Sequence, residues 1–319
     1  NAGPDGTLAA ALCAGTAVDA TLGSGAVLFG GTCGWDEGDG SATNAAAFLQ
    51  ALLAKVKART ATAAESNTLA AAAAGGFAVL GGCGEDTVAF ASGNAAVFGT
   101  VALGEGYDRV ALAGVASGGT VTLPATDGVE LLAVTNCPDV SAANTAGFAE
   151  LFVGSNSLCR LKDVSCVFEG LYGTGTVAPE GTLQVTGTIA VARFESAATG
   201  AVLNVSGDLT LGNGVTCALR ATEEGGEWIH DRVAVSGLLT VASGGTVDLG
   251  CAEESPLALN TRLVLFTAAG GIANPGALSG WRLTGTGRDD ERKVIRTVRA
   301  EGNTVVAVIS VGGTFISIR

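Results

Sequence analysis

The chain has no methionine, a single histidine and only six prolines among its 319 residues. So few prolines exclude a collagen-like fibre, which needs proline-rich Gly-x-y triplets. Charged residues make up 15% of the chain and hydrophobic residues 48%, which excludes intrinsic disorder because a disordered chain needs the reverse balance. Aromatic residues are also scarce, at 5%. We therefore expect a folded body whose interior is filled by small side chains.

Long apolar runs are missing as well. No uninterrupted run reaches the ~18–20 residues that a membrane-spanning helix needs, so we expect no membrane span. Because position 1 is Asn rather than Met, we expect that a preceding segment has been removed, most simply a secretory signal peptide. These features predict an extracellular or cell-surface protein.

Basic residues are few and unevenly placed. Seventeen Lys and Arg stand against thirty Asp and Glu, for a formal net charge of −13. This charge disfavours binding to nucleic acids and to anionic membranes, which are themselves negatively charged. Residues 1–54 contain no basic residue, whereas 282–319 contain seven against four acidic ones, a net charge of +3. The chain thus combines an acidic body with a basic C-terminal segment.

Cysteine spacing argues against metal and redox sites. The eight cysteines include no C-x-x-C pair, and His230 is the only histidine, so we expect neither zinc nor another cofactor. In an exported protein an even number of cysteines favours disulfides, here four. Cys13–Cys33 and Cys159–Cys166 are the local pairs that we predict. The alternative is that the thiols are free and buried, packed as small hydrophobic side chains.

The chain divides into three zones. Residues 1–43 are apolar and punctuated by glycine, and we expect a strand-bearing assembly segment. Residues 44–76 change to a helical period, with one helix that begins at Asn44 and a second that covers 63–74. Residues 77–319 return to the short alternating runs that are typical of strands. The pattern predicts a short helical hairpin inserted into a β-rich body.

An internal echo indicates that this body is repetitive. The run YDRVALAG at 107–114 is matched by HDRVAVSG at 230–237, and each is followed by SGGTV, at 117–121 and 243–247. Short strand–turn units rich in Gly, Ala, Thr and Val suit a β-solenoid, in which each coil buries its apolar face against its neighbours. We therefore expect a mainly β fold, a β-solenoid or parallel β-helix. An array of β-sandwiches is the alternative, because the strand spacing varies.

The segment 227–285 carries a more specific pattern. Its runs are HDRVAVSG at 230–237, GGTVDL at 244–249, LVLFTAAGGI at 263–272 and WRL at 281–283. It resembles the passenger region of bacterial autotransporter-type surface proteins, in particular the autotransporter-associated β-strand repeat. The resemblance implies a right-handed parallel β-helix exposed on a cell surface and implies no activity. The chain departs from that family because no outer-membrane barrel follows Arg319, so secretion through its own barrel is not expected.

Several motifs are weak candidates for chemistry. GGCGEDTVA at 81–89 matches the calcium nonapeptide, but that site needs tandem copies, so we interpret it as a glycine-rich turn that leads into a strand. DEGDG at 36–40 lacks the fuller spacing of an EF-hand and is interpreted as a solvated turn. His230 has no catalytic partner in Asp231, because adjacent residues of a strand point to opposite faces. The recurring pairs Asp108/Arg109 and Asp231/Arg232 predict a structural ion pair or a turn-capping Asp.

No catalytic groove is expected. Enzymes built on parallel β-helices bring carboxylates, arginines and aromatic rings together. The densest polar cluster in the middle of the chain is flanked by Cys159 and Cys166, as a disulfide-tied loop would be; it comprises Arg160, Lys162, Asp163 and Glu169. We therefore expect a structural extracellular protein, not an enzyme, that assembles with copies of itself into a filament or sheath. The alternative is a cell-surface adhesin or carbohydrate-binding module with surface glycans as partners.

The C-terminal segment is the predicted contact between copies. Residues 304–311 are β-forming and uncharged, 314–318 alternate in polarity, and neither run contains a Pro or Lys that would protect an edge strand. Such an edge recruits a strand from a neighbouring copy, head to tail. The candidate assembly residues are Val305, Val306, Val308, Ile309, Phe315, Ile316 and Ile318. The alternative is that 304–318 forms the last coils of its own chain.

Overall fold

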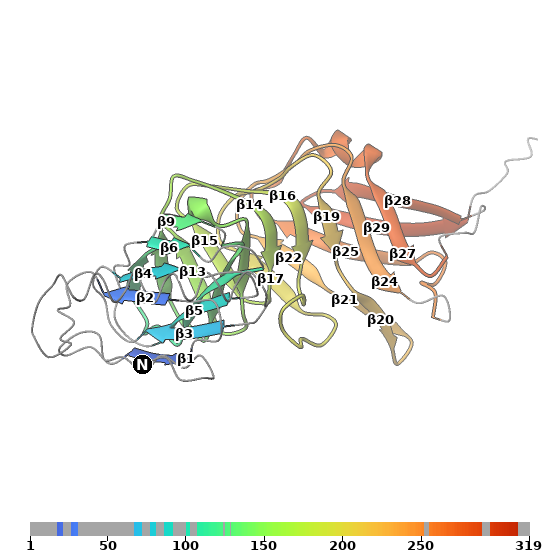
Figure 1. The fold of residues 1–319 in the computed structure, drawn as a ribbon. Coiled ribbons are helices and arrows are strands. Elements are labelled where there is room, and N and C mark those ends of the chain that lie inside the picture. The colour runs from blue at the N-terminus through green and yellow to red at the C-terminus, as the bar shows by residue number, and fades with distance from the viewer. Residues whose placement is uncertain are drawn as a thin grey trace, which may run out of the picture. The chain divides into compact units, whose positions relative to one another are not determined.

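The protein is mainly β, and most of its strands pair in parallel with strands of the next coil (Figure 1). The computed structural model describes residues 18–21, 27–30, 67–71, 77–80, 86–91, 100–102, 107–123, 125–127, 129–251, 255–288 and 294–311. The chain divides into two compact units, Asn1–Asp163 and Val164–Arg319. The predicted solenoid fold is confirmed. A β-sandwich would instead pair its strands in antiparallel sheets, so that alternative is wrong.

The described residues of the first unit form three sheets. One has the order β1 (Val18–Thr21), β3 (Asn67–Ala71), β5 (Asp86–Ala91), β7 (Arg109–Ala113), β10 (Leu131–Thr135), β12 (Glu150–Val153). The second contains β8 (Gly119–Thr122), β11 (Val140–Ala143) and β13 (Leu158–Leu161), and the third contains β2 (Val27–Gly30), β4 (Phe77–Leu80), β6 (Thr100–Ala102) and β9 (Ala125–Asp127). A short 3-10 helix, η1 (Thr145–Gly147), follows β11.

The register of these ladders defines the coil length. Val110 pairs with Leu132, 22 residues further on, and Leu132 pairs with Leu151 after another 19. All three side chains are fully buried, so each of these coils contributes one apolar layer to a column that runs from β7 to β12. At the N-terminal end, β1 and β2 run antiparallel to β3 and β4. They are the last strands of their sheets among the described residues.

In the second unit, the described strands form two long sheets and one separate hairpin. The first sheet comprises β14 (Ser165–Tyr172), β16 (Thr182–Ala190), β18 (Leu209–Leu211), β19 (Thr216–Ala218), β23 (Leu239–Val241), β24 (Thr246–Cys251), β26 (Ile272–Ala273) and β27 (Arg282–Thr286). The second comprises β15 (Thr176–Pro179), β17 (Val202–Val205), β22 (Arg232–Val235), β25 (Arg262–Ala268), β29 (Thr304–Val311) and β28 (Val294–Glu301). β20 (Ala221–Glu224) and β21 (Glu227–His230) form a separate antiparallel hairpin, and η2 (Pro275–Gly280) is a 3-10 helix.

Coils lengthen along the second unit. Leu203 pairs with Val233, 30 residues on, and Val233 pairs with Phe266 after another 33. All three side chains are buried. The extra residues lie outside the ladders, for example in the β20–β21 hairpin, so the core column keeps its spacing. This explains why strand spacing in the sequence is irregular although the fold is repetitive.

The predicted helical hairpin is wrong in its second half. Residues 67–71, which were assigned to a helix over 63–74, form β3 and pair in parallel with β5. Alanine has a high helix propensity, but propensity is a weak prior that the pairing of a strand within a sheet overrides. The helix predicted to begin at Asn44 lies outside the described residues, as do the zone boundaries predicted after residues 43 and 76.

Candidate functional site

Part of the predicted assembly surface is buried within the C-terminal hairpin, which β28 and β29 form. β29 lies between β25 and β28 and is antiparallel to both. Val305, Val306 and Ile309 are therefore fully buried core residues, and Val308 is half-buried. The run 304–311 is not an edge strand; it packs within its own chain, as the alternative prediction held. Phe315, Ile316 and Ile318 lie outside the described residues.

A turn that the sequence analysis missed causes this arrangement. Gly302 and Asn303 form a two-residue turn between the paired residues Glu301 and Thr304. Gly302 has a φ of 58°, a backbone conformation that glycine adopts without a steric penalty. A Gly-Asn dipeptide between two apolar β-forming runs is a hairpin signal. It would have predicted that 294–301 folds back onto 304–311.

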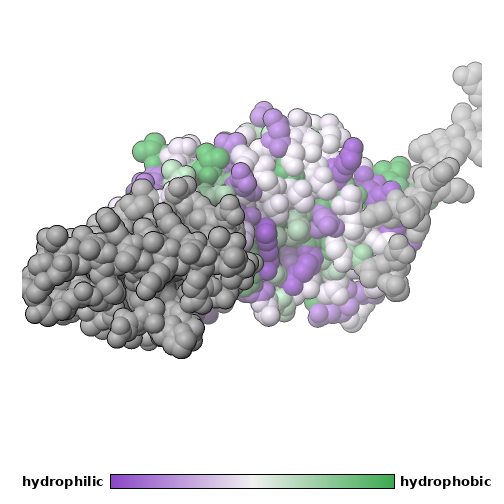
Figure 2. All heavy atoms as spheres, viewed as in Figure 1, coloured by the Kyte–Doolittle hydropathy of each residue, from purple (hydrophilic) through white to green (hydrophobic). Residues whose placement is uncertain are grey.

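Because β29 is paired on both sides, the edge strands of the second unit are strands other than β29. Among the described residues, β28 pairs only with β29, and β27 pairs only with β24. Two large apolar side chains are exposed on the terminal hairpin, Ile295 on β28 (47%) and Val311 at the end of β29 (52%). On the face in Figure 2, by contrast, most of the described surface is pale or hydrophilic and green patches are few.

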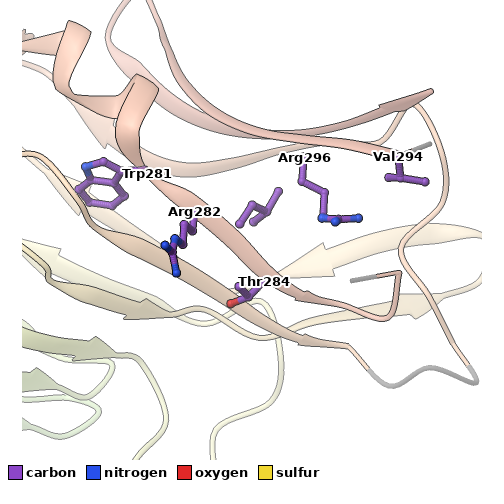
Figure 3. A pocket seen from close by; sticks show the side chains of 6 residues that line it. Trp281, Arg282, Thr284, Val294 and Arg296 are labelled. Atoms are coloured by element: carbon purple, nitrogen blue, oxygen red, sulfur yellow. The ribbon is translucent and has the colours of Figure 1, made fainter. Parts of the chain in front are cut away.

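A cleft of about 420 Å³ lies between these two edge strands (Figure 3). Its lining residues are Trp281, Arg282, Leu283, Thr284, Val294 and Arg296. Trp281 forms a fixed wall: it is 6% exposed, and its Nε1 donates a hydrogen bond of 2.7 Å to the carbonyl of Ala242. Its indole ring lies so close to Gly245 that a Cβ there would be 2.5 Å from the ring.

The arginines on and near β27 and β28 differ in the groups that they contact. Arg262 and Arg299 each contact Glu301, at 2.8 and 2.7 Å. Hydrogen bonds from Arg299 and then from Arg262 lower the pKa of Glu301. Arg282 is exposed and has no ion-pair partner among the described residues, while Arg296 donates from Nη1 to the carbonyl of Arg288 at 2.7 Å. Arg282 therefore places an exposed positive charge on the cleft.

The predicted role of the repeated Asp/Arg pairs is confirmed for Asp231, with a different arginine. Asp231 is 0% exposed, and its Oδ1 accepts hydrogen bonds from the backbone N–H groups of Gly200 and Ala201, at 3.0 and 3.1 Å. Its ion-pair partner is Arg220, whose Nε lies 2.7 Å from Oδ2, and not the neighbouring Arg232. Asp231 is thus a turn-capping residue that joins two coils.

The other copy of the motif occupies a different position in the coil. Asp108 precedes β7, in the first sheet of the first unit, whereas Asp231 precedes β22, in the second sheet of the second unit. Both aspartates are fully buried. The N–H of Asp108 donates to the carboxylate of Glu130 at 2.7 Å. In both copies of the repeated motif, the aspartate therefore directly precedes a strand.

The remaining polar candidates are dispersed. Arg160 makes a two-point contact with Asp139, with Nε–Oδ1 at 2.7 Å and Nη2–Oδ2 at 3.2 Å. Asp163 accepts hydrogen bonds from the backbone N–H groups of Asn144 and Thr145 at the start of η1, at 2.9 and 2.7 Å. Glu169 lies in β14 of the second unit. The structure thus gives Arg160 and Asp163 roles that join neighbouring coils.

His230 makes a hydrogen bond to the backbone, and the two acidic motifs lie partly or wholly outside the described residues. Nε2 of His230 donates to the carbonyl of Val264 at 2.8 Å. Asp86 begins β5, so a strand follows the glycine-rich turn expected at 81–85, which itself lies outside the described residues, as does 36–40. Within the described part of the chain, no three His, Cys, Asp or Glu residues come together in a way that could hold a metal ion.

The prediction of four disulfides is wrong. Cys137 and Cys217 are free, buried thiols, which leaves too few cysteines for four bonds. Burial raises the pKa of both, that of Cys217 to about 12. Cys217 stacks between Ile189 and Val247 in its ladder, where a thiol packs as a small hydrophobic group.

The two predicted pairs stay predictions. Cys159 lies in β13 of the first unit and Cys166 in β14 of the second, both buried. Cys13 and Cys33 lie outside the described residues.

No protein-family model matches the chain, and no curated protein matches it. The resemblance to autotransporter passenger regions therefore stays a prediction. In the described part of the chain, no helix has both the length and the apolar character that a membrane crossing requires.

Proposed function

We propose that this protein is a structural extracellular protein that assembles end to end with copies of itself into a filament or sheath. The observation that carries the proposal is that described strands pair on one side only at the N-terminal side of the first unit and at the C-terminal side of the second. Among these strands are β1 and β2 in the first unit and β27 and β28 in the second; β8, β9 and β26 also have one partner each among the described strands. An unpaired strand edge offers N–H and C=O groups to another chain.

Charge supports a head-to-tail contact. Residues 1–163 have a formal net charge of −9, while 282–319 have +3. Two copies of the β27–β28 end do not pair readily with each other, because Arg282 is exposed on β27 and a charged edge resists pairing with its own kind. An acidic edge of another copy is attracted instead. A contact between two different surfaces propagates into a filament when its rotation closes no ring.

Carbohydrate binding is the weaker candidate. Sugar-binding surfaces stack exposed aromatic rings on the sugar. Trp281 in the cleft is 6% exposed and is hydrogen-bonded to the backbone, and Tyr172 is fully buried. Trp228 and Tyr107 are half-buried, and neither lines the cleft. We therefore retain self-assembly as the proposal.

Microscopy and mass measurement test the proposal. The purified chain is expected to form filaments in negative-stain electron microscopy and to show a mass that rises with protein concentration in light scattering. Raising the salt concentration is expected to raise the concentration at which filaments appear, because salt screens the attraction between oppositely charged ends. A chain that stays monomeric at every concentration and every salt level would refute the proposal.

A further inference from the structure

We infer that Asn213 is a site of spontaneous deamidation, a covalent modification in which the backbone nitrogen of Gly214 is the nucleophile and water is the co-reactant. The two residues form the one Asn-Gly dipeptide of the 319-residue sequence. They lie in the turn that joins β18 to β19 in the second unit. The inference goes beyond the proposed self-assembly and does not depend on it.

The turn leaves both reacting groups accessible. Asn213 and Gly214 are exposed, and a Cβ added to Gly214 would meet no atom of the described residues within 4 Å. Gly214 has a φ of 73°, a conformation that glycine adopts without a steric penalty. Because glycine has no Cβ, its backbone approaches other groups more closely than that of any other residue. Its nitrogen is therefore well suited to reach the side-chain amide carbon of Asn213.

The hydrogen bonds that hold these groups are long. Oδ1 of Asn213 accepts a hydrogen bond from Oγ of Ser243 at 3.5 Å, and the N–H of Gly214 donates to the carbonyl of Ser243 at 3.2 Å. Both distances lie at or beyond the upper end of the usual range for such bonds. Ser243 belongs to the next coil, so a small local opening between the two turns frees the nitrogen and the side-chain carbonyl together.

Asn144 in the first unit shows the opposite arrangement. It is also exposed, but its Nδ2 donates a hydrogen bond of 2.8 Å to the carbonyl of Leu123. The next residue, Thr145, is buried, and its N–H donates to Oδ2 of Asp163 at 2.7 Å. The amide and the following nitrogen are thus both held, and the branched side chain of Thr145 restricts the approach. Asn144 is therefore an internal reference that we expect to stay unmodified.

The reaction balances with water alone. The nitrogen of Gly214 gives its proton to hydroxide or water and bonds to Cγ of Asn213. The Cγ–Nδ2 bond then breaks, and Nδ2 takes up a proton and leaves as ammonia. Water opens the resulting cyclic imide at either carbonyl, which yields an aspartate or an isoaspartate. Each event thus consumes one water, releases one ammonia and adds one negative charge to the turn.

The next coil offers a matched position. β18 pairs in parallel with β23 and β19 with β24, so Asn213 and Gly214 correspond to Ser243 and Gly244. Ser243 is exposed, and Gly244 has the same φ of 73° as Gly214. A serine therefore fits this place in a coil, and it has no amide to lose. Asn213→Ser is the matched variant, and Ser243→Asn transplants the dipeptide to an equivalent turn.

Incubation of the full chain in water enriched in heavy oxygen tests the inference. The chain is held at neutral and at mildly alkaline pH, digested at acidic pH and mapped by mass spectrometry with fragmentation. Isoaspartate is measured by methylation with an isoaspartyl methyltransferase. We expect Asn213 to lose ammonia, to gain one heavy oxygen and to become a methyl acceptor, and to do so faster at alkaline pH because the nitrogen of Gly214 must lose its proton. Asn144 is expected to gain no heavy oxygen.

The variants locate the reaction. Asn213→Ser is expected to lose the methyl-acceptor signal, and adding Ser243→Asn to that variant is expected to restore it at the transplanted turn. Circular dichroism checks that each variant is folded. The inference is overturned if Asn213 in the unmodified chain gains no more heavy oxygen than Asn144, or if the signal persists in full in Asn213→Ser. A folded double variant that stays unmodified overturns the assignment of the reaction to this turn geometry. These measurements need no filaments, so the proposed function stands or falls separately.

Discussion

Replacing Asp231 with alanine tests whether one buried carboxylate holds two coils together. The change deprives the N–H groups of Gly200 and Ala201 of their acceptor, and each N–H left unsatisfied costs about 1–3 kcal/mol. The other partner, Arg220, is 41% exposed, so water solvates it and its loss adds at most about 1 kcal/mol. We expect Asp231→Ala to destabilise the second unit by about 3 kcal/mol.

The control comes from the sequence itself. Arg232 follows Asp231 directly but is exposed, and it makes none of the contacts of Asp231. Arg232→Ala is therefore expected to change stability by less than about 0.5 kcal/mol. In double-mutant cycles, Asp231 and Arg220 are expected to show a coupling of about 0.5–1 kcal/mol, and Asp231 and Arg232 a coupling near zero.

Hydrogen exchange is the suitable assay, because a solenoid need not unfold in one step. In native-state exchange measured by mass spectrometry, the amides of Gly200 and Ala201 are expected to lose protection in Asp231→Ala and to keep it in Arg232→Ala. Thermal denaturation of each variant measures the global effect. Unchanged protection at both amides in Asp231→Ala, or equal coupling to the two arginines, would refute the reasoning.

Two further predictions concern a close contact and a capping carboxylate. Gly245→Ala is expected to lower the free energy of unfolding by about 1–3 kcal/mol through overpacking, because the new Cβ would lie 2.5 Å from the indole of Trp281. A urea titration followed by tryptophan fluorescence measures this loss. Gly276→Ala is the control, because the new Cβ there has open space. Burial raises the pKa of Asp163, but its hydrogen bonds from Thr145 and Asn144 outweigh burial and hold the pKa below its ordinary 3.8. The stabilisation from Asp163 is therefore present above that value and is lost as pH falls through the lower folded-state pKa. Asp163→Asn is expected to cost about 1–2 kcal/mol at pH 7 and progressively less below about pH 4, as measured by urea titrations at several pH values; a difference that does not depend on pH would contradict this account.

Local sequence determined the fold class and several turns. Alternating apolar residues predicted strands such as β17 and β24, and the structure places those residues in buried columns. Glycine-containing turns follow the same logic: Gly214 and Gly244 both have a φ of 73°, which favours glycine at those positions. These features depend on residues close to each other in sequence, so composition and period suffice to predict them.

Tertiary structure alone decided the partners. It paired Asp231 with Arg220 rather than with its neighbour Arg232, placed the alanine-rich segment 67–71 in a strand and buried β29 between two others. The reason is that each ladder joins residues about one coil apart, and the coil length changes from 19 residues at Leu132–Leu151 to 33 at Val233–Phe266. Insertions outside the ladders set that length, and no local pattern encodes it. Which side chains meet across coils, and which strands remain as edges, is therefore decided only when the coils stack.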